Sequence, residues 1–265
     1  MLNVLYCVDG ADRGRRWLKF SIDSLLGHHK DARVFVASEC PFEYKDTVWI
    51  DAAPYIERFG MKRIQGIVKN GMHPTPMQIF RLAAPCLDEL KDVGSVLYLD
   101  IDTEIARPGL NELPQGGFDA DVMALFEHSQ HGNDSTSIML KDPELRAEMS
   151  EHTVNRLSDG GYFNSGVMLM NLAWWRRNHP GWGDDLPHVI DLAVRHHRIV
   201  VDQDISNVVL TAVPLAPEFN VMPDTDVQYY VKNPCVVHYA NMSKYETSAY
   251  PPPEVRARLV KSIKT

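Results

Sequence analysis

The chain has 265 residues, with 27 Lys and Arg against 35 Asp and Glu, which gives a formal net charge of −8. Hydrophobic residues make up 45% and charged residues 23%, close to the globular average, so a disordered chain, a collagen and a coiled coil are excluded. Because nucleic-acid affinity comes mainly from cationic contacts, the acidic balance indicates no nucleic-acid partner. No apolar run approaches the length of about 18 residues that a membrane span requires.

Residues 1–8 are apolar but carry neither a positively charged region nor a small-residue cleavage site. They predict a first strand rather than a signal peptide. The 4 cysteines are widely scattered, without a CxxC pair or zinc-site spacing. Reduced, mostly buried thiols in a cytoplasmic protein are therefore expected.

Short apolar runs alternate with helical patterns along the chain. Strands are expected at residues 3–8, 33–37, 95–99, 121–126, 166–172 and 234–238. Helices are expected near residues 17–26, 76–90, 143–157, 186–195 and 205–210. This alternation predicts an α/β fold with a central, mostly parallel sheet.

Local signals refine this pattern. Thr75 and Asp142 each precede a proline, and a capping side chain followed by proline is typical of a helix start. Pro85 should end or kink the helix that begins after Thr75. The polar stretch 128–137 predicts a surface loop.

The pair Asp100 and Asp102 follows the apolar run 95–99. Residues two apart on a strand project to the same side, and ligands of open α/β sheets lie beyond the carboxyl ends of strands. Two such carboxylates suit Mg²⁺ or Mn²⁺, especially with a diphosphate supplying further oxygens. A calcium loop is excluded, because its sixth and twelfth positions hold Ile105 and Asn111. A phosphatase with Asp100 as nucleophile stays open, although Glu104 stands where such enzymes usually have Thr or Val.

Three further polar segments stand at strand or helix ends. They are Asn164-Ser165-Gly166 ahead of an apolar run, Asp202-Gln203 where a strand passes into a helix, and His238 ending a late strand, with Lys244 beyond it. In their order and spacing, and together with the aspartate pair, they resemble glycosyltransferase family 8 over roughly residues 3–244.

The resemblance implies a GT-A fold, which is Rossmann-like and binds nucleotide sugars, in a single domain of residues 1–249 followed by a short basic tail of residues 250–265. It implies a metal-dependent retaining hexosyltransferase that uses UDP-glucose or UDP-galactose. The acceptor would be a glycan or a lipid-linked sugar, as in lipopolysaccharide biosynthesis. Asp100, Asp102 and His238 would hold Mn²⁺, with Mg²⁺ as the alternative, since an imidazole beside carboxylates favours Mn²⁺.

The resemblance also assigns roles residue by residue. Gln203 and Asp202 would lie beside the donor sugar and are the catalytic candidates. Lys244 would contact the diphosphate, and Asp9 would lie near the uracil. The full set of donor-binding candidates is Asp9, Arg81, Asp100, Ile101, Asp102, Glu127, Asn164, Ser165, Asp202, Gln203, His238, Asn241 and Lys244.

Some positions depart from the family pattern. The first loop, expected over residues 9–16, lacks the Asn-Tyr pair that often packs on the base, Glu127 replaces an Asp, and Asn241 replaces a Gly. A sugar-nucleotide-binding protein without turnover is a second alternative beside the phosphatase; its mark would be a damaged metal triad, and the triad here is intact. The basic tail indicates at most peripheral contact with a membrane surface.

Overall fold

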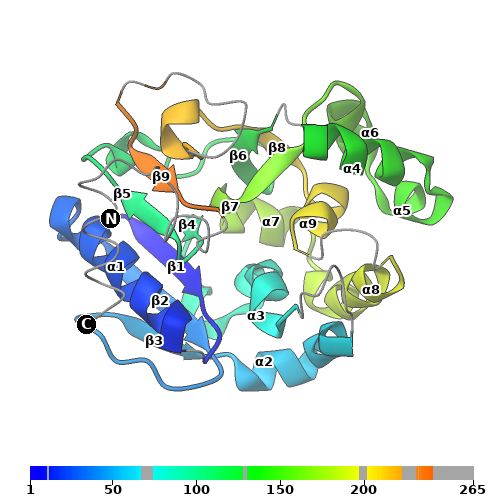
Figure 1. Ribbon diagram of the computed structural model, residues 1–265. Helices are drawn as coiled ribbons and strands as arrows, with labels where there is room; N and C mark the ends of the chain where they lie inside the picture. The colour runs from blue at the N-terminus through cyan, green and yellow to red at the C-terminus, as the bar shows by residue number, and fades with distance from the viewer. Residues whose placement is uncertain are drawn as a thin grey trace.

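A seven-stranded sheet runs through the centre of the molecule, with helices on both of its faces (Figure 1). This computed structural model describes residues 1–10, 12–66, 74–127, 130–196, 202–222, 231 and 233–240. The strand order is β3-β2-β1-β4-β7-β6-β8. The strands are β1 (Asn3–Cys7), β2 (Arg33–Ser38), β3 (Val48–Asp51), β4 (Val96–Leu99), β6 (Val122–Phe126), β7 (Phe163–Met170) and β8 (Ala212–Pro214).

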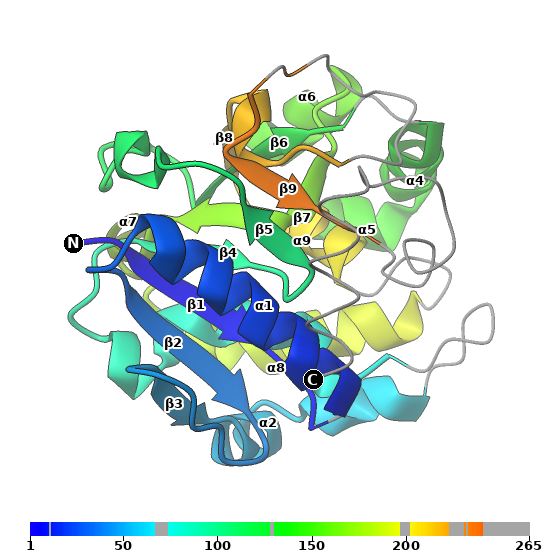
Figure 2. The same ribbon diagram turned by 60° about the vertical axis from the view of Figure 1, so that its left-hand side comes forward.

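The sheet is parallel except at β7, which pairs antiparallel with both β4 and β6. The predicted mostly parallel sheet is therefore confirmed. Two further strands, β5 (Thr103–Ile105) and β9 (Val236–His238), form a separate antiparallel pair. Figure 2 places this pair beside α1, with which β5 is in contact.

Alternating side chains of the strands build two cores. In β1, Leu5 and Cys7 enter one core, whereas Val4 and Tyr6 enter the other. The helix α1 (Asp12–His28) covers the second core. The remaining helices contribute to the first core: α2 (Ala53–Arg58), α3 (Pro76–Ile79), α4 (Gln130–Lys141), α5 (Pro143–Glu148), α6 (Glu151–Ser158), α7 (Leu172–Asn178), α8 (Trp182–Arg195) and α9 (Gln203–Val209). Full burial of one Leu, Ile or Val side chain in these cores stabilises the fold by about 1.5–3 kcal/mol.

The predicted helix at 76–90 is wrong in its extent. After α3 the chain continues as 3-10 turns at Phe80–Cys86 and Asp88–Leu90. Pro85 lies inside the first turn, where its missing N–H cannot serve an α-helix. The expected start is confirmed, because Gln78 Oε1 accepts a hydrogen bond from the backbone N–H of Thr75 at 3.1 Å.

The predicted helix at 143–157 is two helices. Asp142 caps α5, accepting hydrogen bonds from the N–H groups of Glu144 and Leu145 at 3.0 and 3.1 Å. The helix α5 ends before Met149, and Ser150 caps α6. A capping side chain in mid-segment favours a new start over continuation.

The loop predicted at 128–137 is wrong, because α4 occupies Gln130–Lys141. Met139 is fully buried, and α4 packs against α5 and α6. Packing of the apolar face of α4 against these helices therefore outweighs the weak helix propensity of its polar sequence. Similarly, the expected first loop at 9–16 is short, since α1 already begins at Asp12.

All six predicted strands are present, although β7 begins earlier than expected, at Phe163. The sequence did not predict β3, β5, β8, α2 or α7. Within the described ranges, every helix is too short or too polar to cross a lipid bilayer. The tail 250–265 lies outside the described residues.

Candidate active site

Two carboxylates and an imidazole converge at the carboxyl end of β4. Asp100 and Asp102 lie in the turn between β4 and β5, and His238 ends β9, whose pairing with β5 aligns it with Thr103. His238 Nε2 is 3.6 Å from Asp100 Oδ2 and 3.5 Å from Asp102 Oδ1. The two aspartates thus meet through a turn, and the expected projection from one face of a strand is wrong.

The backbone of β7 forms one wall of this cluster. The N–H of Asp100 donates to the carbonyl of Gly166 at 2.7 Å. A Cβ at Gly166 would lie 2.1 Å from His238 Cε1 and 2.7 Å from Asp100 Oδ2. Only glycine therefore allows the imidazole and the carboxylate to approach the strand so closely.

The donor set fits a divalent metal ion. One ligand atom from each of Asp100, Asp102 and His238 lies within 4.8 Å of the others. Oxygen and imidazole ligands together suit first-row transition ions, and a partly buried cluster excludes much competing water. Burial alone would lower the pKa of His238, but the neighbouring carboxylates of Asp102 and Asp100 outweigh it, so the pKa lies above 6.5.

A buried arginine joins this cluster to a second carboxylate. Arg81 Nη2 lies 3.2 Å from Asp100 Oδ1 and 3.1 Å from Asp202 Oδ2. Its guanidinium stacks over the ring of Tyr98 at 4.3 Å, and Nη1 donates to Ser165 Oγ at 3.2 Å. Arg81 therefore fixes Asp100 relative to Asp202 and offsets part of their negative charge.

Tyr98, in β4, holds the carboxylate of Asp100 by a hydrogen bond. Its hydroxyl donates to Asp100 Oδ1 at 2.6 Å. Burial raises the pKa of Tyr98 well above its ordinary value, so the hydroxyl keeps its proton and remains a donor. A hydrogen bond to a charged acceptor is stronger than a neutral one.

A network of amides and a carboxylate adjoins the cluster. Asn164 Nδ2 donates to Glu127 Oε1 at 2.9 Å and to Gln203 Oε1 at 3.0 Å. The N–H of Ser165 donates to Gln203 Oε1 at 3.2 Å, and Gln203 Nε2 donates to Glu127 Oε1 at 3.2 Å. Gln203 Nε2 also lies 3.2 Å from the hydroxyl of Tyr162. These contacts hold Gln203 and Glu127 in one orientation.

Asp202 stands at the N-cap position of α9 but its side chain makes no capping hydrogen bond. It faces Arg81 instead, as described above. Burial raises the pKa of Asp202, and the charge of Arg81 opposes that rise. The carboxylate of Asp202 is therefore held on the side of the site by Arg81.

Two more predicted residues, Asp9 and Ile101, lie close to Gly14 in the first turn of α1. A Cβ at Gly14 would lie 3.2 Å from Asp9 Oδ1 and 3.4 Å from Ile101 Cδ1. Asp9 follows β1, and Ile101 lies between the two metal-facing aspartates. The structure thus brings these two together, whereas Asn241 and Lys244 lie outside the described residues.

Four residues of the site were not among the sequence candidates: Tyr98, Tyr162, Gly166 and Asn220. The glycine of the Asn-Ser-Gly segment was the one available signal, because a glycine between polar residues and a strand indicates close backbone approach. Tyr162 and Asn220 act through contacts with distant segments, to Gln203 and to His238 respectively, and Tyr98 is a residue of an ordinary buried strand that bonds Asp100 two positions on.

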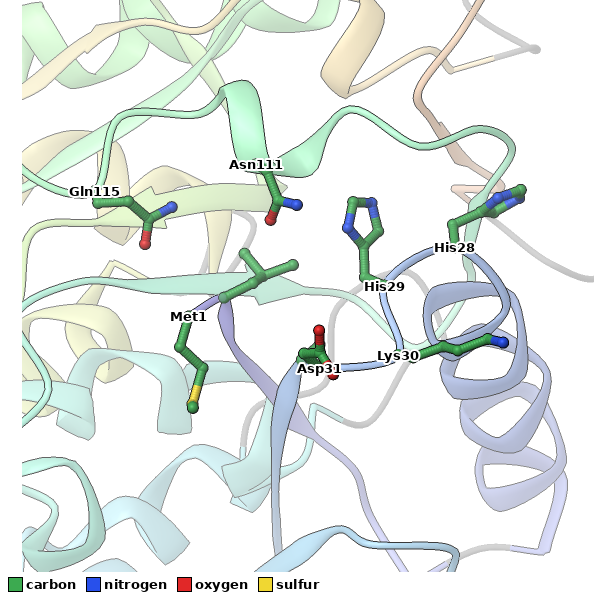
Figure 3. A pocket seen from close by; sticks show the side chains of 9 residues that line it. Met1, His28, His29, Lys30, Asp31, Asn111 and Gln115 are labelled. Atoms are coloured by element: carbon green, nitrogen blue, oxygen red, sulfur yellow. The ribbon is translucent and has the colours of Figure 1, made fainter.

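A separate cavity of about 400 Å³ lies at the opposite end of the sheet (Figure 3). Leu2 and Ala32, at the beginnings of β1 and β2, contribute to its lining, together with His29, Asn111 and Gln115. Asp9 and Asp100 follow the other ends of the parallel strands β1 and β4. The cavity is therefore not part of the site.

Comparison with solved structures identifies the fold. The chain aligns with the galactosyltransferase LgtC, solved with donor and acceptor sugar analogues, at TM-score 0.63 and 20% identity, covering 99% of this chain and 95% of that one. It aligns with WbbM, a bifunctional glycosyltransferase, at TM-score 0.63 and 16% identity, covering 99% of this chain and 49% of that one. Mouse xyloside xylosyltransferase 1 aligns at TM-score 0.57 and 15% identity, covering 91% of this chain and 98% of that one. The fold is the GT-A fold of glycosyltransferases, as predicted.

The family follows from the sequence itself. The profile described as Glycosyl transferase family 8 matches residues 55–245. A comparison with curated protein sequences found no match. The chain belongs to glycosyltransferase family 8 and is a glycosyltransferase, which decides against the phosphatase alternative.

Proposed function

We propose that the protein is a metal-dependent retaining hexosyltransferase that moves glucose or galactose from UDP to a hydroxyl acceptor. The observation that carries this proposal is the convergence of Asp100, Asp102 and His238, whose ligand atoms lie within 4.8 Å of one another. Mn²⁺ is the proposed ion, with Mg²⁺ as the alternative. When bound, the ion supplies a Lewis acid that neutralises charge on the leaving diphosphate.

The chain's own residues then position the donor. Arg81 holds Asp100 and Asp202 in place at 3.2 and 3.1 Å, so the metal side and the sugar side of the site keep a fixed separation. Asp202 would accept hydrogen bonds from hydroxyls of the donor sugar. Gln203 would present its amide oxygen, which Ser165 and Asn164 orient, to positive charge developing at the anomeric carbon.

Retention needs attack from the face that the leaving group vacates, or two successive inversions. We propose the first route, in which the acceptor hydroxyl loses its proton to an oxygen of the departing diphosphate. The second route needs a carboxylate nucleophile, and the candidates are Asp202 and Glu127. Asp202 is ion-paired with Arg81, and Glu127 Oε1 accepts two amide hydrogen bonds, so both carboxylates are already engaged.

The remaining roles are part of the same proposal. Asp9 and Ile101 would border the nucleotide, and Asn241 and Lys244 would contact the diphosphate. Residues 1–249 would form the single catalytic domain. The acceptor would be a glycan or lipid-linked sugar, as in lipopolysaccharide synthesis. The protein would be cytoplasmic, with at most a peripheral membrane contact made through the basic tail 250–265.

Calorimetric titration with UDP, GDP and ADP, each with and without Mn²⁺, tests the donor class. We expect Mn²⁺-dependent binding of UDP above the other two, and a screen of UDP-sugar hydrolysis then names the sugar. Asp100→Asn should lose both binding and turnover. Turnover at the wild-type rate in Asp100→Asn would refute the metal role, and UDP binding without any turnover of UDP-sugars would favour the non-catalytic alternative.

A further inference from the structure

Asn220 lies directly behind the imidazole of His238 and is fully buried. Its segment reaches this place by pairing with β9: the N–H of His238 donates to the carbonyl of Val221 at 2.9 Å, and Val221 in turn donates to Val236 at 3.0 Å. His238 Nδ1 lies 3.3 Å from Asn220 Oδ1. On the other side, Asn220 Nδ2 lies 3.0 Å from Asn164 Oδ1.

The orientation of each group in this chain follows from one backbone donor. The N–H of Gly166 can only donate, and it lies 3.0 Å from Asn164 Oδ1, so this atom is the acceptor. Asn220 must then turn its amide nitrogen to Asn164 and its oxygen to His238. An oxygen facing His238 Nδ1 requires a proton on that nitrogen, so in the neutral imidazole the lone pair lies on Nε2.

We infer that Asn220 is a positioning residue that fixes the tautomer and ring orientation of His238, so that Nε2 is presented to the metal beside Asp100 and Asp102. Metal-bound histidines commonly donate their second N–H to such a partner. Here the partner is itself held by Asn164, whose amide nitrogen contacts Gln203 and Glu127. The hydrogen-bond chain therefore links the metal ligand to the donor-sugar side. This inference rests on the proposed function of the site.

Two variants of Asn220 separate its two contacts. Asn220→Leu removes both, and should weaken Mn²⁺ binding by about 10–100-fold. Asn220→Asp keeps an acceptor for His238 Nδ1 but offers no donor to Asn164. We expect Mn²⁺ affinity of Asn220→Asp to match or exceed the wild-type value, while KM for the UDP-sugar rises.

The readout is Mn²⁺ affinity in the absence of donor, measured by titration of the 265-residue chain, with nitrogen NMR of labelled histidine to report the His238 tautomer. At a pH high enough to leave His238 neutral despite its raised pKa, the wild-type spectrum should show one histidine protonated at Nδ1 that the Asn220→Leu spectrum lacks. Thermal unfolding without metal identifies any variant that fails to fold; Asn220→Asp then serves alone, since its retained affinity is the diagnostic result. Equal affinities in wild type and a folded Asn220→Leu variant would overturn the inference, as would a loss in Asn220→Asp as large as in Asn220→Leu. Failure of the wild-type protein to bind Mn²⁺ would instead overturn the proposed function.

Discussion

Replacing Gly166 with alanine should remove metal binding while leaving most of the fold intact. The added Cβ would lie 2.1 Å from His238 Cε1, whereas carbon atoms in contact prefer about 3.5–4.0 Å. The ring must therefore move by more than about 1 Å, and metal–ligand distances tolerate only about 0.2 Å. The φ angle of Gly166 is outside the positive range, so the backbone accepts alanine and the effect is steric.

The magnitude can be set from these distances. Loss of His238 as a ligand should cost more than the tenfold to about 100-fold that an outer contact costs, so we expect Mn²⁺ affinity to fall by at least about 100-fold. Overpacking of this kind destabilises a fold by about 1–3 kcal/mol, because neighbours must shift. Both quantities are accessible on one sample, by Mn²⁺ titration and by urea unfolding without metal.

Two further variants make the assignment specific. Gly94→Ala is the matched control, because a Cβ there meets nothing within 4 Å, and it should bind Mn²⁺ as the wild type does. Adding His238→Ala to Gly166→Ala removes the ring that the methyl group displaces, and should recover much of the lost stability without restoring metal affinity. Wild-type Mn²⁺ affinity in Gly166→Ala would refute the steric reasoning.

Three other substitutions probe the surroundings of the site. Tyr98→Phe removes the 2.6 Å hydrogen bond to Asp100 and should lower Mn²⁺ affinity by about tenfold, so an unchanged titration would contradict the role of the hydroxyl. Arg81→Met leaves Asp100 and Asp202 without their shared cation and should lower the free energy of unfolding by about 3 kcal/mol, measured in urea; a loss below about 1 kcal/mol would argue against the buried pairing. Asp142→Ala removes the cap of α5 and a contact with His196, neither of which touches a site residue, and should cost about 1 kcal/mol with no change in the transfer rate; a slower enzyme would show that α5 influences catalysis.

Much of the sheet was predictable because its strands are short and almost wholly apolar. Buried strands such as β4 can be recognised from their apolar composition alone. The carboxyl ends of such strands then predict where ligands bind. The strands that the sequence missed, such as β3 and β5, are short and are defined by their partners. The helix α4 was missed for a related reason, since its polar sequence becomes helical through packing against α5 and α6.

The sequence predicted which motifs contribute residues to the site, but not the contacts that those residues make in the folded chain. Asp100 and Asp102 follow an apolar run, so a ligand site there could be expected, whereas His238 was assigned to the site through the family resemblance. Asn220 has no such signal, because its neighbour His238 is reached through pairing of two separate segments. Arg81 could be read as a surface residue of a helix, and only the tertiary structure reveals that it is buried between two carboxylates.

The pairing of β6 with β7 encloses the segment that carries α4, α5 and α6. Phe126 at the end of β6 stands opposite Phe163 at the start of β7, and the N–H of Glu127 donates to the carbonyl of Tyr162 at 2.6 Å. The chain thus leaves the sheet at the end of β6 and returns at the start of β7, and these two points are hydrogen-bonded to each other. Insertions whose ends are already neighbours add little closure entropy as they lengthen. Lengthening or trimming the three-helix excursion would therefore change its closure entropy little, and what limits its exchange is the packing of Met139, Leu145 and Leu157 into the first core.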